Sequence, residues 1–196
     1  MRWRPALAAW AAALALAGGC SAGGDEGPPR DDGAGDGGDQ GGCDRIEPSD
    51  DDEGDGEVAL GTGYEAFEPL DDDIPIIAGP QGGFHLNLNA RVRGLDLGDP
   101  DDLLDPENPS TAFGIYTAEG ERLDIDTCPV RVGYRADGDE GVLPRGVSVV
   151  FEVAGVEELV PLFDGPVLVR VEVVDSRGRY AADERTIVVR APVPAG

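Results

Sequence analysis

A strict alternation of apolar and polar residues is the feature that most constrains the fold of this chain. In residues 84–93, with sequence FHLNLNARVR, every second position is apolar and the positions between are polar. Residues 167–173, with sequence VLVRVEV, have valine at every second position. A period of two places successive side chains on opposite faces of an extended strand, whereas a helix needs a period of 3.6 residues. The pattern therefore predicts half-buried β-strands.

Shorter strand candidates are separated by turn sequences. They cover residues 58–60, 74–78, 112–117, 123–125, 130–135, 147–153 and 187–189. GPQG at 79–82, AEGE at 118–121 and DSRG at 175–178 have Pro or Gly where β-turns favour them. Val156 to Leu162 could form a helical turn, which Pro161 cuts short. Strands of this kind predict an all-β fold, a single antiparallel β-sandwich of about seven to nine strands over residues 57–196.

Two resemblances refine this prediction. Asp164-Gly165, VLVRVEVVDSRGR and the final TIVVR resemble the last two strands of bacterial immunoglobulin-like (Ig-like) and PKD-like domains. This resemblance implies that the sandwich is Ig-like. GTGYEAFEPL followed by IIAGPQGGFH resembles segments of uncharacterised lipoproteins of myxobacteria and related bacteria, a similarity that brings no known activity.

The first twenty residues predict export. Arg2 and Arg4 precede a wholly apolar run over residues 6–17, which is shorter than the roughly twenty residues of a membrane-spanning helix. A charged start, a short apolar run and small residues are typical of a signal peptide, here residues 1–19. Leu16-Ala17-Gly18-Gly19-Cys20 resembles a bacterial lipobox, which implies cleavage before Cys20 and its acylation, palmitate included. An ordinary cleaved signal with an unmodified cysteine is the alternative.

The lipobox resemblance also implies a location. Cys20 becomes the first residue of a lipoprotein held in the cell envelope by its acyl chains, because two or three chains anchor a protein stably. In enteric bacteria an Asp after the lipidated cysteine retains the protein in the inner membrane. Ser21 stands at that position, so we expect the outer membrane.

Residues 20–56 have the composition of a tether. Residues 21–56 contain eleven Gly and ten Asp, and Ile46 is their only large aliphatic residue. Such a segment cannot bury enough apolar surface to offset the entropy cost of ordering. We therefore expect a disordered acidic tether between Cys20 and a domain that begins at about Glu57.

The cysteine count predicts one disulfide. If Cys20 carries lipid, Cys43 and Cys128 remain as an even pair in an oxidising compartment. A disulfide between them would fasten the end of the tether to the domain, and two separate thiols are the alternative.

Charge and residue inventory exclude several functions. The formal net charge of −25 argues against nucleic-acid binding, which needs clustered positive charge. All the basic residues are Arg, so Schiff-base and P-loop chemistry, which need an amine, are excluded. His85 is the only histidine, and no Ser lies in a Gly-x-Ser-x-Gly motif. We expect no enzymatic activity, and a hydrolase is a less favoured alternative.

Two polar groups are candidate sites. His85, Asn87, Asn89 and Arg91 occupy the polar face of the 84–93 strand, where they could recognise a glycan or an acidic partner; an ordinary solvated sheet face is the alternative. Asp99, Asp101, Asp102 and Asp105 crowd one loop. Calcium takes six to eight oxygen ligands, so calcium is a possible cofactor, although acidic loops commonly serve only solubility. We expect no other metal or cofactor.

The function predicted from these features is that of a membrane-anchored, non-catalytic envelope lipoprotein. It would present an Ig-like binding or adhesion module to an envelope protein or a glycan. The alternatives are a structural subunit of an envelope assembly and a calcium-dependent surface protein.

Overall fold

The structure is a computed structural model that describes residues 46, 48, 56–125 and 128–194. The predicted signal peptide, Cys20, Cys43 and nearly all of the predicted tether lie outside these residues, so the predictions on them stay predictions. Gly41–Gly196 belong to one compact unit, and the fold is that of its described part. None of the helices in the described ranges has the length and apolar character needed to cross a bilayer.

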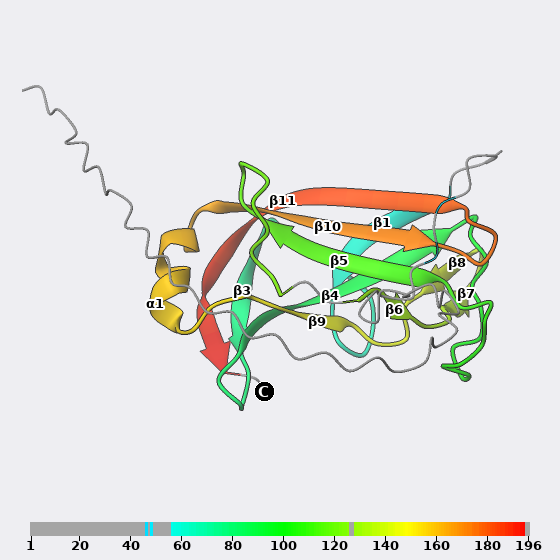
Figure 1. The fold of residues 1–196 in the computed structure, drawn as a ribbon, viewed down its shortest axis with the longest axis horizontal. Helices are drawn as coiled ribbons and strands as arrows, with labels where there is room; N and C mark the ends of the chain where they lie inside the picture. Colours follow the sequence, from blue (N-terminus) through cyan, green and yellow to red (C-terminus); the bar gives the residue numbers. More distant parts are fainter. Residues whose placement is uncertain (1–45, 47, 49–55, 126–127, 195–196) are drawn as a thin grey trace, which may run out of the picture. The chain divides into compact units, whose positions relative to one another are not determined.

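The described residues form an all-β fold in which eleven strands make one mixed sheet (Figure 1). The strands are β1 (Glu57–Thr62), β2 (Glu68–Pro69), β3 (Asp73–Ala78), β4 (Phe84–Arg93), β5 (Ser110–Tyr116), β6 (Val130–Arg131), β7 (Arg135–Asp137), β8 (Glu140–Val142), β9 (Val147–Val150), β10 (Pro166–Val174) and β11 (Tyr180–Pro194). One helical turn, α1 (Val156–Leu159), continues into a 3₁₀ turn over Val160–Leu162. The helical segment at 156–162 is therefore confirmed.

The sheet curls into a half-barrel around β4 and β3. One edge of β4 pairs with β3 at Phe84 and His85 and with β1 from Leu88 to Arg93, while its other edge pairs with β9 and β8. From β3 the sheet continues through β11, β10 and β5 to β6. The curl brings β1 into contact with β10 and β11, so the core lies inside it.

The purely antiparallel arrangement predicted from the sequence is wrong. β3 and β11 run parallel, with Asp73 opposite Val188 and Ile74 opposite Val189. Parallel neighbours need a long crossover connection, and nearly the whole described domain lies between these two strands in sequence. The alternation of apolar residues cannot show this, because it fixes the faces of a strand but not its partner.

The strand count also exceeds the predicted seven to nine. β2, β6, β7 and β8 have only two or three residues each, too few for an alternation to be visible. The strand predicted at 123–125 is instead reduced to isolated bridges, from Tyr116 to Arg122 and from Asp124 to Phe151.

The core confirms the two strongest strand predictions. Leu86, Leu88 and Ala90 of β4 are completely buried, and so are Val169 and Val171 of β10. Complete burial of a Leu or Val side chain contributes roughly 1.5–3 kcal/mol. The inward residues of these two strands therefore account for a large part of the stabilisation, with Ile76, Ile115, Leu159 and Val189 completing the same cluster.

Candidate functional site

The predicted polar stripe on β4 is largely covered by the connection between β1 and β2. Asn89 is completely buried, and its Nδ2 donates a hydrogen bond to the Gly63 carbonyl at 3.0 Å. Asn87 is half-buried; its carbonyl accepts a bond from Thr62 Oγ1 at 2.8 Å, and its Oδ1 accepts one from Ser148 Oγ at 2.9 Å. The two asparagines are thus engaged within the domain.

His85 and Arg91, the other members of the stripe, are half-buried. His85 lies opposite Ile77 of β3 and Val150 of β9, and burial lowers its pKa below the ordinary value of 6.5. Arg91 Cζ lies 4.5 Å from the centroid of the Phe67 ring, a cation–π distance. Its Nη1 lies 3.4 Å from Glu140 Oε2.

Gly61 explains how Phe67 reaches Arg91. A Cβ at Gly61 would lie 2.3 Å from the Phe67 ring, so only glycine lets the ring lie directly on β1. The ring and the turn at residues 63–66 then cover the polar face of β4. The segment GTGYEAFEPL, whose resemblance implies no known activity, therefore has a structural role.

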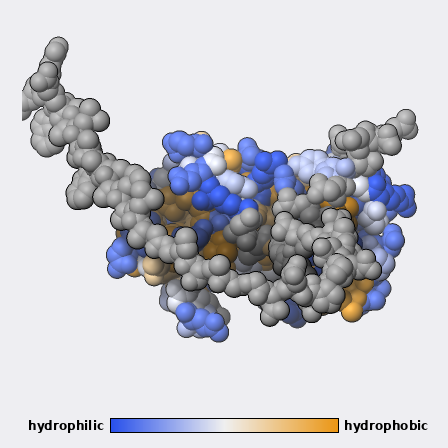
Figure 2. Space-filling view, in the orientation of Figure 1, coloured by the Kyte–Doolittle hydropathy of each residue, from blue (hydrophilic) through white to orange (hydrophobic). Residues whose placement is uncertain are grey.

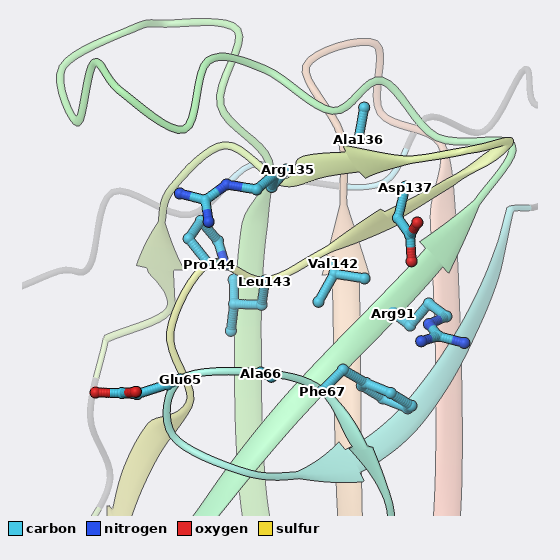
Figure 3. A pocket seen from close by; sticks show the side chains of 10 residues that line it. All are labelled: Glu65, Ala66, Phe67, Arg91, Arg135, Ala136, Asp137, Val142, Leu143 and Pro144. Atoms are coloured by element: carbon cyan, nitrogen blue, oxygen red, sulfur yellow. The ribbon is translucent and has the colours of Figure 1, made fainter.

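A pocket of about 680 Å³ lies beside this cover. A second pocket of about 330 Å³, seen in Figure 3, shares three lining residues with it, Arg135, Leu143 and Pro144. We call the two pockets together the arginine groove. Its charged lining residues are Glu65, Arg91, Asp101, Arg131, Arg135, Asp137 and Arg145, and its apolar lining residues include Tyr64, Phe67, Leu103, Val130, Val132, Val142, Leu143 and Pro144.

Backbone contacts hold the walls of the groove. The Gly146 N–H donates to the Tyr64 carbonyl at 2.8 Å, and a Cβ at Gly146 would lie 2.4 Å from the Gly63 oxygen. Opposite, the Tyr134 N–H donates to the Leu97 carbonyl at 2.7 Å. The Tyr134 side chain is buried, its hydroxyl lies 2.8 Å from Thr111 Oγ1, and burial raises its pKa. Arg135 therefore follows a residue that is fixed in the core.

Arg135 and Arg145 are exposed, and within the described part of the chain neither has a hydrogen bond or an ion pair. Every other arginine of that part has a carboxylate or carbonyl partner. These are Arg91, Arg93, Arg122, Arg131, Arg170, Arg177, Arg179, Arg185 and Arg190. Both of these arginines line the same pocket.

Within the described residues, none of the acidic residues of the groove forms an ion pair with Arg135 or Arg145. In Figure 3 the Arg135 side chain extends over Pro144, whereas Asp137 points toward Arg91 at the opposite end of the pocket. Two apolar side chains at the rim of the groove are exposed to solvent: Leu103 is 68% exposed and Tyr64 is 50% exposed. The face of the domain seen in Figure 2 has apolar areas between hydrophilic ones.

The acidic loop uses its carboxylates on its own backbone. Asp99, Asp102 and Asp105 each accept a hydrogen bond at 2.9 Å from the N–H two residues further on. Asn108 is completely buried and closes the loop through the Asp99 N–H and the Asp102 carbonyl. Asp101, which lines the arginine groove, accepts no such bond from the residues that the structure describes. In the described ranges, no three His, Cys, Asp or Glu residues gather as metal ligands.

Three residues of the predicted tether are described, Ile46, Pro48 and Gly56, and the first two lie on the domain. Ile46 and Pro48 line a pocket of about 270 Å³ together with Ser110 of β5, Pro129 and Tyr180 of β11. Cys128, next to Pro129, has an interaction partner. Cys43 lies outside the described residues, so the disulfide stays a prediction.

The fold and the groove define an all-β protein with a concave, arginine-lined surface. Neither a protein-family model nor a curated protein or solved structure matches the chain. Sequence reasoning did not single out Arg135 and Arg145, because they lie on a short strand and in a loop where no periodicity exists. Their one available signal was that they are basic residues in a strongly acidic chain.

Proposed function

We propose that the chain is a membrane-anchored, non-catalytic lipoprotein of the cell envelope whose domain is an Ig-like binding module. The observation that carries this proposal is the arginine groove. It combines two unpaired arginines with exposed apolar side chains on a surface held by buried residues. Binding sites are typically concave, largely preformed and lined by apolar groups with a few polar ones.

The strand arrangement supports the Ig-like form of the module. β1, β4, β8 and β9 form one half of the curled sheet, and β11, β10, β5 and β6 form the other. The Leu60 N–H of β1 donates a hydrogen bond at 2.9 Å to Asp183 Oδ2 of β11, which joins the halves across the curl. Within each half the strands pair antiparallel, while β3 joins the halves and runs parallel to β11. Two halves around a common core are the basic plan of a sandwich.

The anchor is supported by the lipobox resemblance and by the place where the tether ends. Ile46 and Pro48 lie against β5 and β11, so the acidic segment between Cys20 and these residues would act as the spacer to the membrane. Replacement of Cys20 by Ser tests this part of the proposal. We expect the chain to leave the membrane fraction, with loss of the acyl mass from the intact protein; an unchanged distribution would contradict the anchor.

Site-specific photo-crosslinking in cells tests the binding role. A photoreactive residue replaces Leu103 at the rim of the groove, and the control carries it at Glu184, an exposed position on β11. We expect a discrete adduct from position 103 and none from position 184. No adduct, or equal adducts at both positions, would overturn the proposal. A stable complex of fixed stoichiometry without irradiation would favour the alternative, a structural subunit.

A further inference from the structure

We infer that the arginine groove binds an acidic peptide segment of a partner protein, one in which carboxylates and apolar side chains are interspersed. This inference rests on the proposed binding function and adds the chemical class of the partner. It depends on the two unpaired arginines, on the exposed apolar rim and on the positions of the acidic lining residues.

Charge complementarity carries the acidic half of the inference. The chain has 40 Asp and Glu against 15 Arg, so carboxylates greatly outnumber guanidinium groups. Arg135 and Arg145 are nevertheless the two arginines of the described part that no carboxylate or carbonyl of that part engages. A guanidinium presents its donors in a planar fork that matches a carboxylate. Two such groups on one pocket are arranged for an external anion.

The apolar rim distinguishes a peptide from an acidic polysaccharide. Leu103 and Tyr64 are half or more exposed, Val130 is 36% exposed, and Leu143 of the same pocket is buried. Aliphatic side chains recover free energy when a partner's apolar groups cover them, and a sugar polymer presents few such groups. Among the residues that line the larger pocket, Tyr64 is the aromatic one available for sugar stacking, and the aliphatic residues outnumber it.

The acidic lining residues restrict how the peptide can lie. Asp101 lies in the larger pocket, and Glu65 and Asp137 lie in the smaller one. A carboxylate of the partner is repelled at these positions and attracted at Arg135 and Arg145. Such repulsion selects one register among several. The expected segment therefore carries spaced acidic residues rather than a continuous acidic run.

Fluorescence anisotropy with defined peptides tests the inference on the full mature chain in non-ionic detergent. The probe is a fluorescein-labelled peptide of eight residues in which Glu alternates with Leu. One comparison peptide replaces every Glu with Gln, another replaces every Leu with Ser, and an oligogalacturonate of similar charge represents acidic sugars. We expect the Glu–Leu peptide to bind at least about tenfold more tightly than each comparison probe.

Two variants locate the binding. Combined Arg135→Gln and Arg145→Gln replacement removes both unpaired charges from exposed positions, so the fold is retained. The control, Arg185→Gln, removes a 61% exposed arginine that is paired with Asp183 on β11. We expect the double variant to bind the Glu–Leu peptide about tenfold more weakly, since carboxylate–arginine hydrogen bonds are among the stronger ones. The control should agree with the parent within about twofold.

Equal binding by the double variant and the parent would overturn the inference, as would preference for the oligogalacturonate or no binding of the Glu–Leu peptide. The crosslinking at position 103 distinguishes failure of the acidic-peptide inference from failure of the proposed binding function. An adduct at position 103 with no peptide binding refutes the acidic-peptide class alone, whereas no adduct and no peptide binding refute both.

Discussion

Arg179 and Asp175 form an ion pair at the turn between β10 and β11, with Arg179 Nη2 2.6 Å from Asp175 Oδ2. The Asp175 side chain is completely buried, while that of Arg179 is 25% exposed. The same carboxylate accepts hydrogen bonds from the N–H groups of Arg177 and Arg179, each at 3.0 Å, and from the Asp96 N–H at 2.9 Å. It therefore joins the hairpin to the loop after β4.

Replacement of Asp175 by Ala should destabilise the domain strongly. The change removes the acceptor of three backbone N–H groups and one partner of Arg179, which keeps Asp96 and the Gly94 carbonyl. Each buried donor left without an acceptor costs about 1–3 kcal/mol, so we expect a loss of about 3 kcal/mol or more. Urea unfolding of the parent and variant measures the difference. Asp139→Ala is the matched control, because Asp139 is 82% exposed and pairs with Arg93 at 3.5 Å. We expect the Asp139→Ala variant to lose less than about 1 kcal/mol. Similar losses in both variants would contradict the structural role of the Asp175 carboxylate.

Gly61→Ala should disturb the cover over β4. The added Cβ would lie 2.3 Å from the Phe67 ring and 2.5 Å from the Glu68 carbonyl oxygen, so the ring and the backbone of β2 must both move away from β1. Overpacking of this kind costs about 1–3 kcal/mol, measured by thermal or urea unfolding.

Gly83→Ala is the control for this change. The nearest atom to a Cβ at Gly83 lies 4.0 Å away, so its stability should stay within about 1 kcal/mol of the parent. If both alanine variants have the same stability, the close contact at Gly61 is not what holds the Phe67 ring over the polar face of β4.

The alternating pattern predicted those parts of the fold that depend on one strand alone. It placed the inward faces of β4 and β10 correctly, because burial of Leu88 or Val171 needs only a period of two and an apolar interior. It could not predict that β3 pairs with β11, because the choice of neighbour depends on contacts between Ile74 and Val189, far apart in sequence. Pairing partners are therefore set by the tertiary fold.

The candidate site was harder to predict for the same reason. Asn89 sits at a polar position of the alternation, yet the turn at Gly63 comes over it from another strand and buries it. Arg135 and Arg145 meet in one pocket only after the chain has folded. The hydrogen bonds from backbone N–H groups to the side chains of Asp99, Asp102 and Asp105 could be predicted from the sequence. Asp often accepts such a bond in a turn, from the N–H two residues further on.

A disulfide between Cys43 and Cys128 should leave no titratable thiol in the unreduced, denatured mature protein when Cys20 is acylated. Ile46 and Pro129 line the same pocket. The three residues from Cys43 to Ile46 reach at most about 11 Å, a span that permits the bond. A thiol assay should detect two thiols after reduction, and Cys128→Ser should expose one without reduction. Two thiols in the unreduced parent would contradict the pairing.

Loss of this bond should also lower stability. A closed loop of this length stabilises by about 4 kcal/mol in the chain-entropy description. Unfolding of the parent in the presence and absence of reductant measures the effect. The Cys128→Ser variant is the control, because reductant should no longer change its stability.

His85 should make stability depend on pH just below neutrality. Burial lowers the pKa of His85 from its ordinary 6.5, because Ile77 and Val150 flank it on the neighbouring strands and disfavour its charged form. Below about pH 6.5 the unfolded chain therefore binds a proton more readily than the folded one, and the free energy of unfolding falls as the pH is lowered. Above that pH both states are neutral at His85, and its contribution is constant.

His85 is the only histidine, and ordinary carboxyl groups titrate near pH 4, so the effect can be isolated. Urea unfolding at about pH 7.5 and about pH 5.5 measures it in the parent and in His85→Gln, which keeps a polar side chain that cannot gain a proton in this range. The parent should lose more stability between the two pH values than the variant does. An equal loss in both would show that groups other than His85 cause the decline.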